Sequence, residues 1–251
     1  MSRNFELLDQ IGKAEVMLQP DTEAKTFPPV DVFNSSVPAL EIDGMARDEV
    51  SKLVHRLFFL SGAEAPRQVV FSGTETGNGT TWICAHASEM LAAHGAPSVC
   101  VVDCNLRAPA LHRKFGVEND LGLADALLGA ESIRQYARQL SRRNLWLISS
   151  GTPSENAQAL LTSDRMHARI SELKAEFDYV LMDVAAINSY DDCRVLARSS
   201  EGVVLVLKAN SSRRDSIRNM IQELRASNVR VLGTVLNQRT FPIPDRIYKR
   251  L

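Results

Sequence analysis

The chain has 251 residues, the size of one large domain or two small ones. Its hydrophobic content of 45% and charged content of 24% are typical of globular proteins and exclude a mostly disordered chain. Aromatic residues make up only 6%, so the apolar mass is aliphatic, which favours a buried parallel sheet covered by helices. The net charge of −1 gives no reason to expect a nucleic-acid partner.

The charge is unevenly distributed along the chain. Residues 1–45 contain three basic and eight acidic side chains, a net charge of −5, whereas residues 208–251 contain ten basic and three acidic ones, a net charge of +7. Two interpretations remain open. These segments are ordinary solvated surfaces, or the basic one faces an acidic partner or an anionic membrane surface.

Several features bear on the cellular compartment. The four cysteines show no metal-ligand spacing and are expected to be reduced thiols in the core. The sequence contains no run of about 18 apolar residues, so no membrane span is predicted. Residues 1–30 lack the apolar centre of a secretory signal. We therefore expect a cytoplasmic protein.

The first predicted boundary lies between residues 45 and 46. Residues 1–45 carry four prolines and little periodicity, which predicts an extended, largely disordered N-terminal arm with one short amphipathic piece at 5–11. Apolar side chains then recur with helical spacing over 46–61. We expect residues 46–251 to form a single domain.

Strands and helices are predicted to alternate from Gln68 onward. The expected strands span residues 68–73, 98–103, 145–149, 179–183, 203–207 and 229–236. The expected helices span 80–94, 122–129, 163–177, 190–199 and 211–227. Alternation of this kind predicts a parallel sheet with helices on both faces and with functional groups along the edge where the strands end.

The loop between the first strand and its helix reads SGTETGNGTT over residues 72–81. Glycines before a helix N-terminus allow backbone N–H groups to point at an anion. A phosphate loop has the pattern G-x-x-x-x-G-K-[ST]. Here Thr74 replaces the first glycine, Gly79 is the second, Thr80 replaces the lysine and Thr81 supplies the magnesium-binding hydroxyl. Taken alone, this stretch is equally well a glycine-rich turn.

Two further strands end in aspartate, Asp103 and Asp183. Carboxylates at strand ends beside a phosphate loop are where Mg²⁺ and an attacking group are managed. Each alone is also compatible with a polar cap of a strand. Their occurrence in order after a phosphate-type loop favours a nucleotide site.

Six ordered motifs give the chain a family resemblance. Residues 72–82 read SGTETGNGTTW, 101–112 include DCNLRAPALH, 122–129 read GLADALLG, 159–166 read ALLTSDRM, Asp183 ends a strand, and 231–237 read VLGTVLN. Together they resemble the cytoplasmic domain of bacterial tyrosine autokinases (BY-kinases) of capsule and exopolysaccharide synthesis, a branch of the MinD/ParA-like deviant P-loop ATPases. The resemblance extends from about residue 40 to residue 251.

The resemblance implies a fold and a site. The fold is a three-layer α/β/α P-loop NTPase-like domain with a mostly parallel sheet of about seven strands. Asp103 and Asp183 are the implied catalytic residues, and Thr81 joins them as a Mg²⁺ ligand. ATP or ADP would contact a set of residues in the loop and after the last strand: Gly77, Asn78, Gly79, Thr80, Thr81, Asn237 and Arg239.

The chain departs from the family where the chemistry occurs. Thr80 occupies the position of the phosphate-binding lysine, Asn105 that of the second aspartate of the D-x-D motif, and a C-terminal tyrosine cluster is absent apart from Tyr248. A charged hydrogen bond contributes about 1.5–3 kcal/mol, so loss of the lysine weakens nucleotide binding about ten- to hundredfold. Phosphoryl transfer depends still more on that positive charge. We therefore expect weak nucleotide binding and an inactive or weak ATPase.

The helix over 46–60 carries a possible self-association motif. Glu49, Lys52 and His55 lie where the family has E-x-x-R-x-x-R, and only the glutamate is identical. Lysine lacks the planar fork of arginine, and histidine lacks its permanent charge. The sequence is compatible with a weak homo-oligomer built on this helix and with an ordinary amphipathic helix.

The leading hypothesis is a regulatory protein of exopolysaccharide biosynthesis and export, for a capsule or a holdfast-type adhesive. By resemblance, its partner is an inner-membrane polysaccharide co-polymerase, which would hold it peripherally at that membrane. The alternatives are an active ATPase or tyrosine autokinase that controls chain length, and a MinD/ParA-like positioning ATPase. The DCNLRAPALH stretch disfavours the last, because the motif belongs to the polysaccharide branch.

Overall fold

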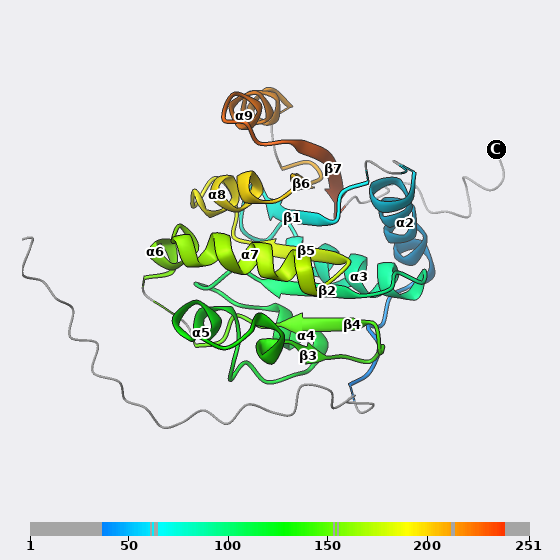
Figure 1. The fold of residues 1–251 in the computed structure, drawn as a ribbon. Coiled ribbons are helices and arrows are strands. Elements are labelled where there is room, and N and C mark those ends of the chain that lie inside the picture. The colour runs from blue at the N-terminus through cyan, green and yellow to red at the C-terminus, as the bar shows by residue number, and fades with distance from the viewer. Residues whose placement is uncertain are drawn as a thin grey trace, which may run out of the picture.

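The computed structural model describes residues 37–60, 62, 65–152, 154, 156–211 and 214–238. A sheet of seven strands runs through its centre in the order β3-β4-β2-β5-β1-β6-β7 (Figure 1). The strands are β1 (Gln68–Gly73), β2 (Val99–Asp103), β3 (Arg138–Gln139), β4 (Leu145–Ile148), β5 (Tyr179–Val184), β6 (Val203–Lys208) and β7 (Val231–Asn237). The short β3 pairs antiparallel with β4, whereas neighbours from β4 to β7 pair in parallel.

Helices cover both faces of the sheet (Figure 1). The described helices are α2 (Gly44–Val54), α3 (Thr80–Ala93), α4 (Leu111–Phe115), α5 (Leu123–Leu128), α6 (Ala157–Leu161), α7 (Asp164–Glu176), α8 (Asp192–Ser199) and α9 (Arg214–Ala226). A π-helical segment His55–Phe59 extends α2, and a 3-10 helix Ile133–Tyr136 precedes β3.

Strand alternation divides the core into two hydrophobic clusters. One cluster joins alternate strand residues, such as Val204 and Val206, to α2, α3 and α4. The other joins the intervening residues, such as Val203 and Leu205, to α5–α9. Successive side chains of a strand point to opposite faces of the sheet. Because helices cover both faces, each central strand is apolar on both sides. This explains the continuous apolar runs in the sequence.

Local sequence signals set the ends of the helices. The Asp43 carboxylate accepts the N–H of Ala46 at 2.8 Å and so begins α2. The Ser163 hydroxyl accepts the N–H of Met166 at 3.3 Å and begins α7. Side-chain oxygens at these positions satisfy N–H groups that the helix itself leaves without a partner.

The predicted fold is confirmed, and the predicted strands and long helices lie within a few residues of their observed positions. Sequence reasoning missed β3, α4 and α6. Each is five residues or shorter, too short for periodicity to reveal. No helix among the described residues is long and apolar enough to cross a membrane.

The predicted N-terminal arm lies mainly outside the described residues. Of its last part, Val37 is buried in the α3-side cluster, and Nε2 of His86 on α3 lies 3.3 Å from the carbonyl oxygen of Glu41. Helix α2 begins at Gly44, two residues before the predicted domain boundary. The extent of the arm and of the domain stays a prediction.

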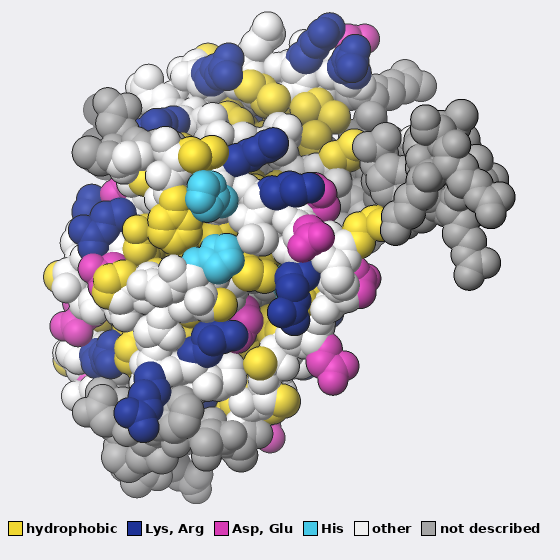
Figure 2. Space-filling view, turned by 90° about the vertical axis from the view of Figure 1, so that its right-hand side faces the viewer, with side chains coloured by type: hydrophobic (Ala, Val, Ile, Leu, Met, Phe, Trp, Pro, Cys, Tyr) yellow, Lys and Arg dark blue, Asp and Glu magenta, His cyan; other side chains and the backbone are white. Residues whose placement is uncertain are grey.

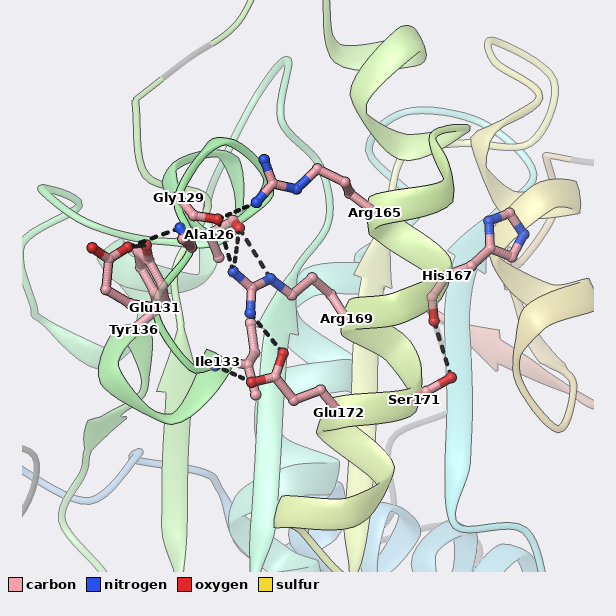
Figure 3. Close-up of polar contacts among 11 residues, drawn as sticks. Ala126, Gly129, Glu131, Ile133, Tyr136, Arg165, His167, Arg169, Ser171 and Glu172 are labelled. Carbon is pink, nitrogen blue, oxygen red and sulfur yellow. Dashed lines mark hydrogen bonds and ion pairs between the residues drawn. The ribbon is translucent and has the colours of Figure 1, made fainter.

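A buried guanidinium joins α5 to α7 (Figure 3). Arg169 is 8% exposed and donates to the carbonyl of Ala126 from Nε and Nη2, at 3.0 and 2.8 Å, and to that of Gly129 at 3.1 Å. Its Nη1 pairs with Glu172 at 2.6 Å, and Glu172 also accepts the N–H of Ile133. Arg165, one turn earlier, donates to the carbonyls of Leu128 and Gly129 from the surface. Two arginines on one face of α7 thus satisfy the C-terminal carbonyls of α5.

Replacing Arg169 by Leu is expected to destabilise the protein by about 2–4 kcal/mol, because it removes both side-chain donors to the buried carbonyl of Ala126 and the cation that pairs with Glu172. The matched control is Arg165→Leu, which removes an exposed donor to the same helix end and should cost less than about 1 kcal/mol. Urea unfolding measures both. Equal losses for the two variants would contradict a structural role for the buried guanidinium.

Candidate functional site

The turn between β1 and α3 depends on two glycines with positive φ. Gly77 and Gly79 have φ values of +86° and +83°. A Cβ on Gly79 would lie 2.3 Å from Nδ2 of Asn237. Any other residue at this position would therefore be strained and would displace the Asn237 side chain. The loop over residues 73–79, called here the phosphate loop, directly precedes the N-terminus of α3.

The phosphate loop is braced from inside the protein by Asn78. Its side chain is 2% exposed and donates to the hydroxyl of Thr74 at 2.8 Å and to the carbonyl of Val206 at 3.0 Å. The N–H of Thr74 donates to the same carbonyl at 3.3 Å. The Asn78 side chain, predicted among the nucleotide contacts, is thus engaged in holding the loop to β6.

The phosphate loop is held from its other side by residues at the end of β7. Nδ2 of Asn237 donates to the carbonyl of Asn78 at 2.9 Å, and Nε2 of Gln238 donates to that of Gly77 at 3.1 Å. The amide nitrogen of Asn237 thus contacts the loop backbone, and the predicted contact of this residue with a nucleotide stays a prediction. Gln238 was missed, because a glutamine after a strand carries no motif signal. Arg239 lies outside the described residues.

The backbone of this region offers donors to an anion. Within the described part of the chain, no protein acceptor is recorded for the N–H groups of Gly77, Gly79, Thr80 and Thr81. They lie at the N-terminus of a 14-residue helix, where the helix dipole favours negative charge. The carbonyls of Gly77 and Asn78 are engaged by Gln238 and Asn237. This arrangement is suited to binding a phosphate group.

The side chain at the lysine position of the motif is short and neutral. A Cβ on Gly73 would lie 2.7 Å from the hydroxyl oxygen of Thr80, so this hydroxyl lies over the start of the loop. Threonine supplies a hydrogen-bonding group there but no positive charge. The loop therefore retains its backbone donors without the charge that usually accompanies them.

The two aspartates predicted from the sequence lie side by side. Asp103 at the end of β2 is the register partner of Asp183 on β5, and both are buried. The Asp103 carboxylate accepts the N–H of Asn105 at 3.1 Å and those of Ala110 and Leu111, both at 2.9 Å. Both of its oxygens thus hold the turn before α4, which leaves little capacity for accepting a proton from a substrate.

The Asp183 carboxyl contacts the start of α3 through Thr81. It accepts a hydrogen bond from the hydroxyl of Thr81, while its buried Oδ2 has no hydrogen-bond partner among the described residues. A hydroxyl beside a free carboxylate oxygen, next to phosphate-binding N–H groups, fits Mg²⁺ held partly by water and phosphate. The described residues contain no cluster of three or more His, Cys, Asp or Glu that could hold a metal by themselves.

Burial controls the protonation of the two carboxyls. Desolvation raises the pKa of Asp183 well above its usual range, and the nearby Asp103 carboxylate raises it further. Desolvation also raises the pKa of Asp103, to about 6, although its three backbone N–H bonds act in the opposite direction. Two carboxyls buried side by side thus favour binding a proton over carrying two negative charges.

Other residues of the motif serve the structure of this edge. The side-chain oxygen of Asn105 accepts the N–H of Ala108 at 3.2 Å and so stabilises the turn. Arg107 forms an ion pair with Asp192, which is 1% exposed at the start of α8, and lies 4.0 Å from the ring centre of Tyr190. Sequence reasoning missed Asp192 and Tyr190: Asp192 is 85 positions from Arg107, and nothing local couples either residue to this arginine.

The residues proposed for self-association lie on the exposed side of α2. Lys52 pairs with Glu49 at 2.7 Å, and both side chains are largely exposed. His55 packs against Phe59 with ring centres 5.9 Å apart, and Phe59 also contacts His94. Figure 2 shows histidines beside exposed hydrophobic side chains on the face on which α2 lies. The intermolecular role of these residues stays a prediction.

The sheet order, the phosphate loop and the buried carboxylates define a P-loop NTPase-like domain. Residues 67–224 match the protein family described as "cellulose biosynthesis protein BcsQ", and the chain belongs to this family. The predicted relationship to bacterial tyrosine kinases and MinD-like ATPases is confirmed by the similarities that follow.

Relatives of the chain include bacterial tyrosine-protein kinases. It is 31% identical over 169 residues to a putative tyrosine-protein kinase EpsB of Ralstonia nicotianae, covering 67% of this chain and 22% of that protein. It is 26% identical over 179 residues to tyrosine-protein kinase YwqD of Bacillus subtilis, covering 71% of this chain and 75% of that protein. The chain thus spans about a fifth of the length of the Ralstonia relatives.

Solved structures show the same fold. The kinase domain of the Escherichia coli tyrosine kinase ETK superposes with a TM-score of 0.72 at 21% identity, covering 89% of this chain and 88% of that chain. The cell division ATPase MinD of Pyrococcus furiosus superposes with a TM-score of 0.60 at 23% identity, covering 74% of this chain and 78% of that chain.

The two raised carboxyl pKa values lead to a prediction about stability. The folded protein binds more protons than the unfolded chain from about pH 4 upward through pH 6, so these groups stabilise the fold at low pH and lose that effect as pH rises. Asp183→Asn removes one of the two charges. We expect the melting temperature of the variant, minus that of the original protein, to increase as pH rises in Mg²⁺-free buffer.

Thermal unfolding at a series of pH values measures this difference, and effects common to both proteins cancel. Asp178→Asn, a change at an exposed carboxylate at the opposite edge of the sheet, is the control. A difference between the Asp183 variant and the original protein that stays constant with pH would show that the two carboxyls are not coupled to folding.

Proposed function

We propose that this protein is a regulatory component of exopolysaccharide biosynthesis and export, of capsule or holdfast type, that acts with an inner-membrane polysaccharide co-polymerase. Its nucleotide site would bind ATP or ADP with Mg²⁺ weakly and support little or no turnover. The observation that carries the proposal is an intact backbone cradle combined with the neutral Thr80 at the lysine position.

The pathway part of the proposal is supported by the relatives. The matched family is described as a cellulose biosynthesis protein. The relatives are tyrosine-protein kinases, the class that the sequence motifs resemble and that the resemblance links to capsule and exopolysaccharide synthesis. Polymer export occurs at the membrane, so a protein that regulates it needs a membrane partner. A co-polymerase would hold this domain at the cytoplasmic side of the inner membrane.

The nucleotide part of the proposal is supported by the site. Thr81 and Asp183 are placed together, and one carboxylate oxygen of Asp183 remains without a hydrogen bond among the described residues. A MinD neighbour from Pyrococcus horikoshii was solved with Mg-ADP. Against turnover, Asp103 is engaged by three backbone N–H groups, and the asparagine at position 105 cannot act as a carboxylate base.

Self-association is a further part of the proposal. The exposed Glu49–Lys52 pair and His55 would contact a second copy, as in the family whose motif they resemble. Exposed ion pairs contribute at most about 1 kcal/mol each. An oligomer held by them would be weak and salt-sensitive, and would assemble fully only on the membrane partner.

The purified protein is expected to hydrolyse ATP at a rate indistinguishable from that of Asp183→Asn and to acquire no phosphotyrosine. The physical reason is the missing charge against the developing negative charge of the transferred phosphoryl group. Radiolabelled ATP and a phosphotyrosine antibody provide the two readouts. ATP-dependent phosphotyrosine that disappears in Asp183→Asn would instead establish an active autokinase.

The regulatory role is tested by complementation. In a strain from which the gene has been deleted, we expect polysaccharide export to fall and to be restored by the original protein. The Asp183→Asn variant should restore it equally well, because the role does not require hydrolysis. Matched protein levels are verified by immunoblot. Restoration by the original protein but not by a stably expressed Asp183→Asn would favour the ATPase alternative, and unchanged export in the deletion strain would refute the pathway assignment.

A further inference from the structure

Four polar side chains lie at the ends of strands on the same face of the sheet. Strand alternation places Asp103 in line with Val101, Asp183 with Leu181, Lys208 with Val206, and Asn237 with Val235. All four of these apolar residues belong to, or pack against, the cluster on the α3 side. The four polar residues therefore project from the carboxyl edge toward the face on which the phosphate loop enters α3.

The strand order arranges these residues around the phosphate loop. The sheet runs β2-β5-β1-β6-β7, and the loop leaves β1. Asp103 and Asp183 thus lie on one side of it, and Lys208 and Asn237 on the other. The side of the loop with the carboxylates is suited to a metal ion, and the other side carries the positive charge of Lys208. A phosphate in the loop would lie between the two.

Lys208 lies close to the phosphate loop because Asn237, its neighbour on β7, contacts that loop. It is the register partner of Asn237, and the amide of Asn237 is 2.9 Å from the carbonyl of Asn78 in the loop. Adjacent strands lie about 4.8 Å apart, and the four-carbon stem of a lysine reaches roughly 6 Å. The ammonium group can therefore reach the mouth of the loop by rotation of its side chain.

Lys208 is also available for a ligand. It is the exposed last residue of the otherwise buried strand β6, and among the described residues no hydrogen bond or ion pair is recorded for its side chain. Two other described cations near this edge are engaged: Arg107 pairs with Asp192, and Arg113 donates to the carbonyl of Pro109 at 2.9 Å.

We propose that Lys208 binds the phosphates of the nucleotide and replaces the lysine that the loop lacks at position 80. The proposal rests on the nucleotide site described under Proposed function and assigns its positive charge to a different strand. Because Lys208 approaches from β6, the charge would act at the side of the loop opposite the carboxylates. Its exposure makes the contribution sensitive to salt.

Calorimetric titration of the full chain with Mg-ADP tests the assignment. Lys208→Gln should weaken binding about tenfold, the lower end of the range for a charge-assisted hydrogen bond. Lys208→Arg should retain most of the affinity. Lys174→Gln is the matched control, since it removes an exposed lysine that pairs with Glu201 at the opposite end of β6 and should leave binding unchanged. In the Lys208→Gln background, Thr80→Lys should restore affinity.

The outcomes separate this proposal from the one on which it rests. Weaker binding of Lys208→Gln, with restoration by Thr80→Lys, supports the assignment. Equal binding by the original protein and Lys208→Gln overturns it and leaves the nucleotide site intact. Binding by Thr80→Lys but not by the original protein shows that Lys208 does not replace the missing charge. If neither protein binds at millimolar Mg-ADP, the nucleotide site and the role of Lys208 fail together.

Discussion

The parallel alignment of the central strands is the constraint on which the site depends. Because the strands run in one direction, their carboxyl ends meet along a single edge, and polar side chains at those ends come together. The order β2-β5-β1-β6-β7 places the loop after β1 in the middle of that edge. The neighbouring strands then hold this loop in place: the carbonyl of Val206 accepts a hydrogen bond from the Asn78 side chain, and the amide of Asn237 donates to the carbonyl of Asn78.

The shape of the loop does not depend on a positive charge at position 80. The loop geometry rests on Gly77, Gly79, Asn78 and the strands beside it, and none of these depends on a lysine at position 80. The Asp103 carboxylate is needed for the turn before α4 whether or not the site carries out chemistry. These motif residues therefore have structural roles that do not depend on catalysis.

Two further family motifs, at 122–129 and 159–166, have structural roles. Arg165 and Arg169 of α7 satisfy the C-terminal carbonyls of α5, so the motifs at 122–129 and 159–166 belong to one packing unit. Asp125 accepts the N–H of Gly122 at 3.0 Å and so stabilises the start of α5. A Cβ on Gly122 would lie 2.0 Å from the carbonyl oxygen of Ser149, which explains a glycine at this close approach to the end of β4.

The sequence by itself determined the α/β class, the long elements and the identity of the loop, because these depend on hydrophobic periodicity and on residues that are neighbours in the chain. It also pointed to Asp103 and Asp183, since each directly ends an apolar strand. Only the tertiary structure decided that Asp103 is engaged by backbone N–H groups, that Asp192 pairs with Arg107, and that Lys208 lies beside Asn237. These relations arise from strand order and register, which bring together residues far apart in the chain, and no local pattern encodes them.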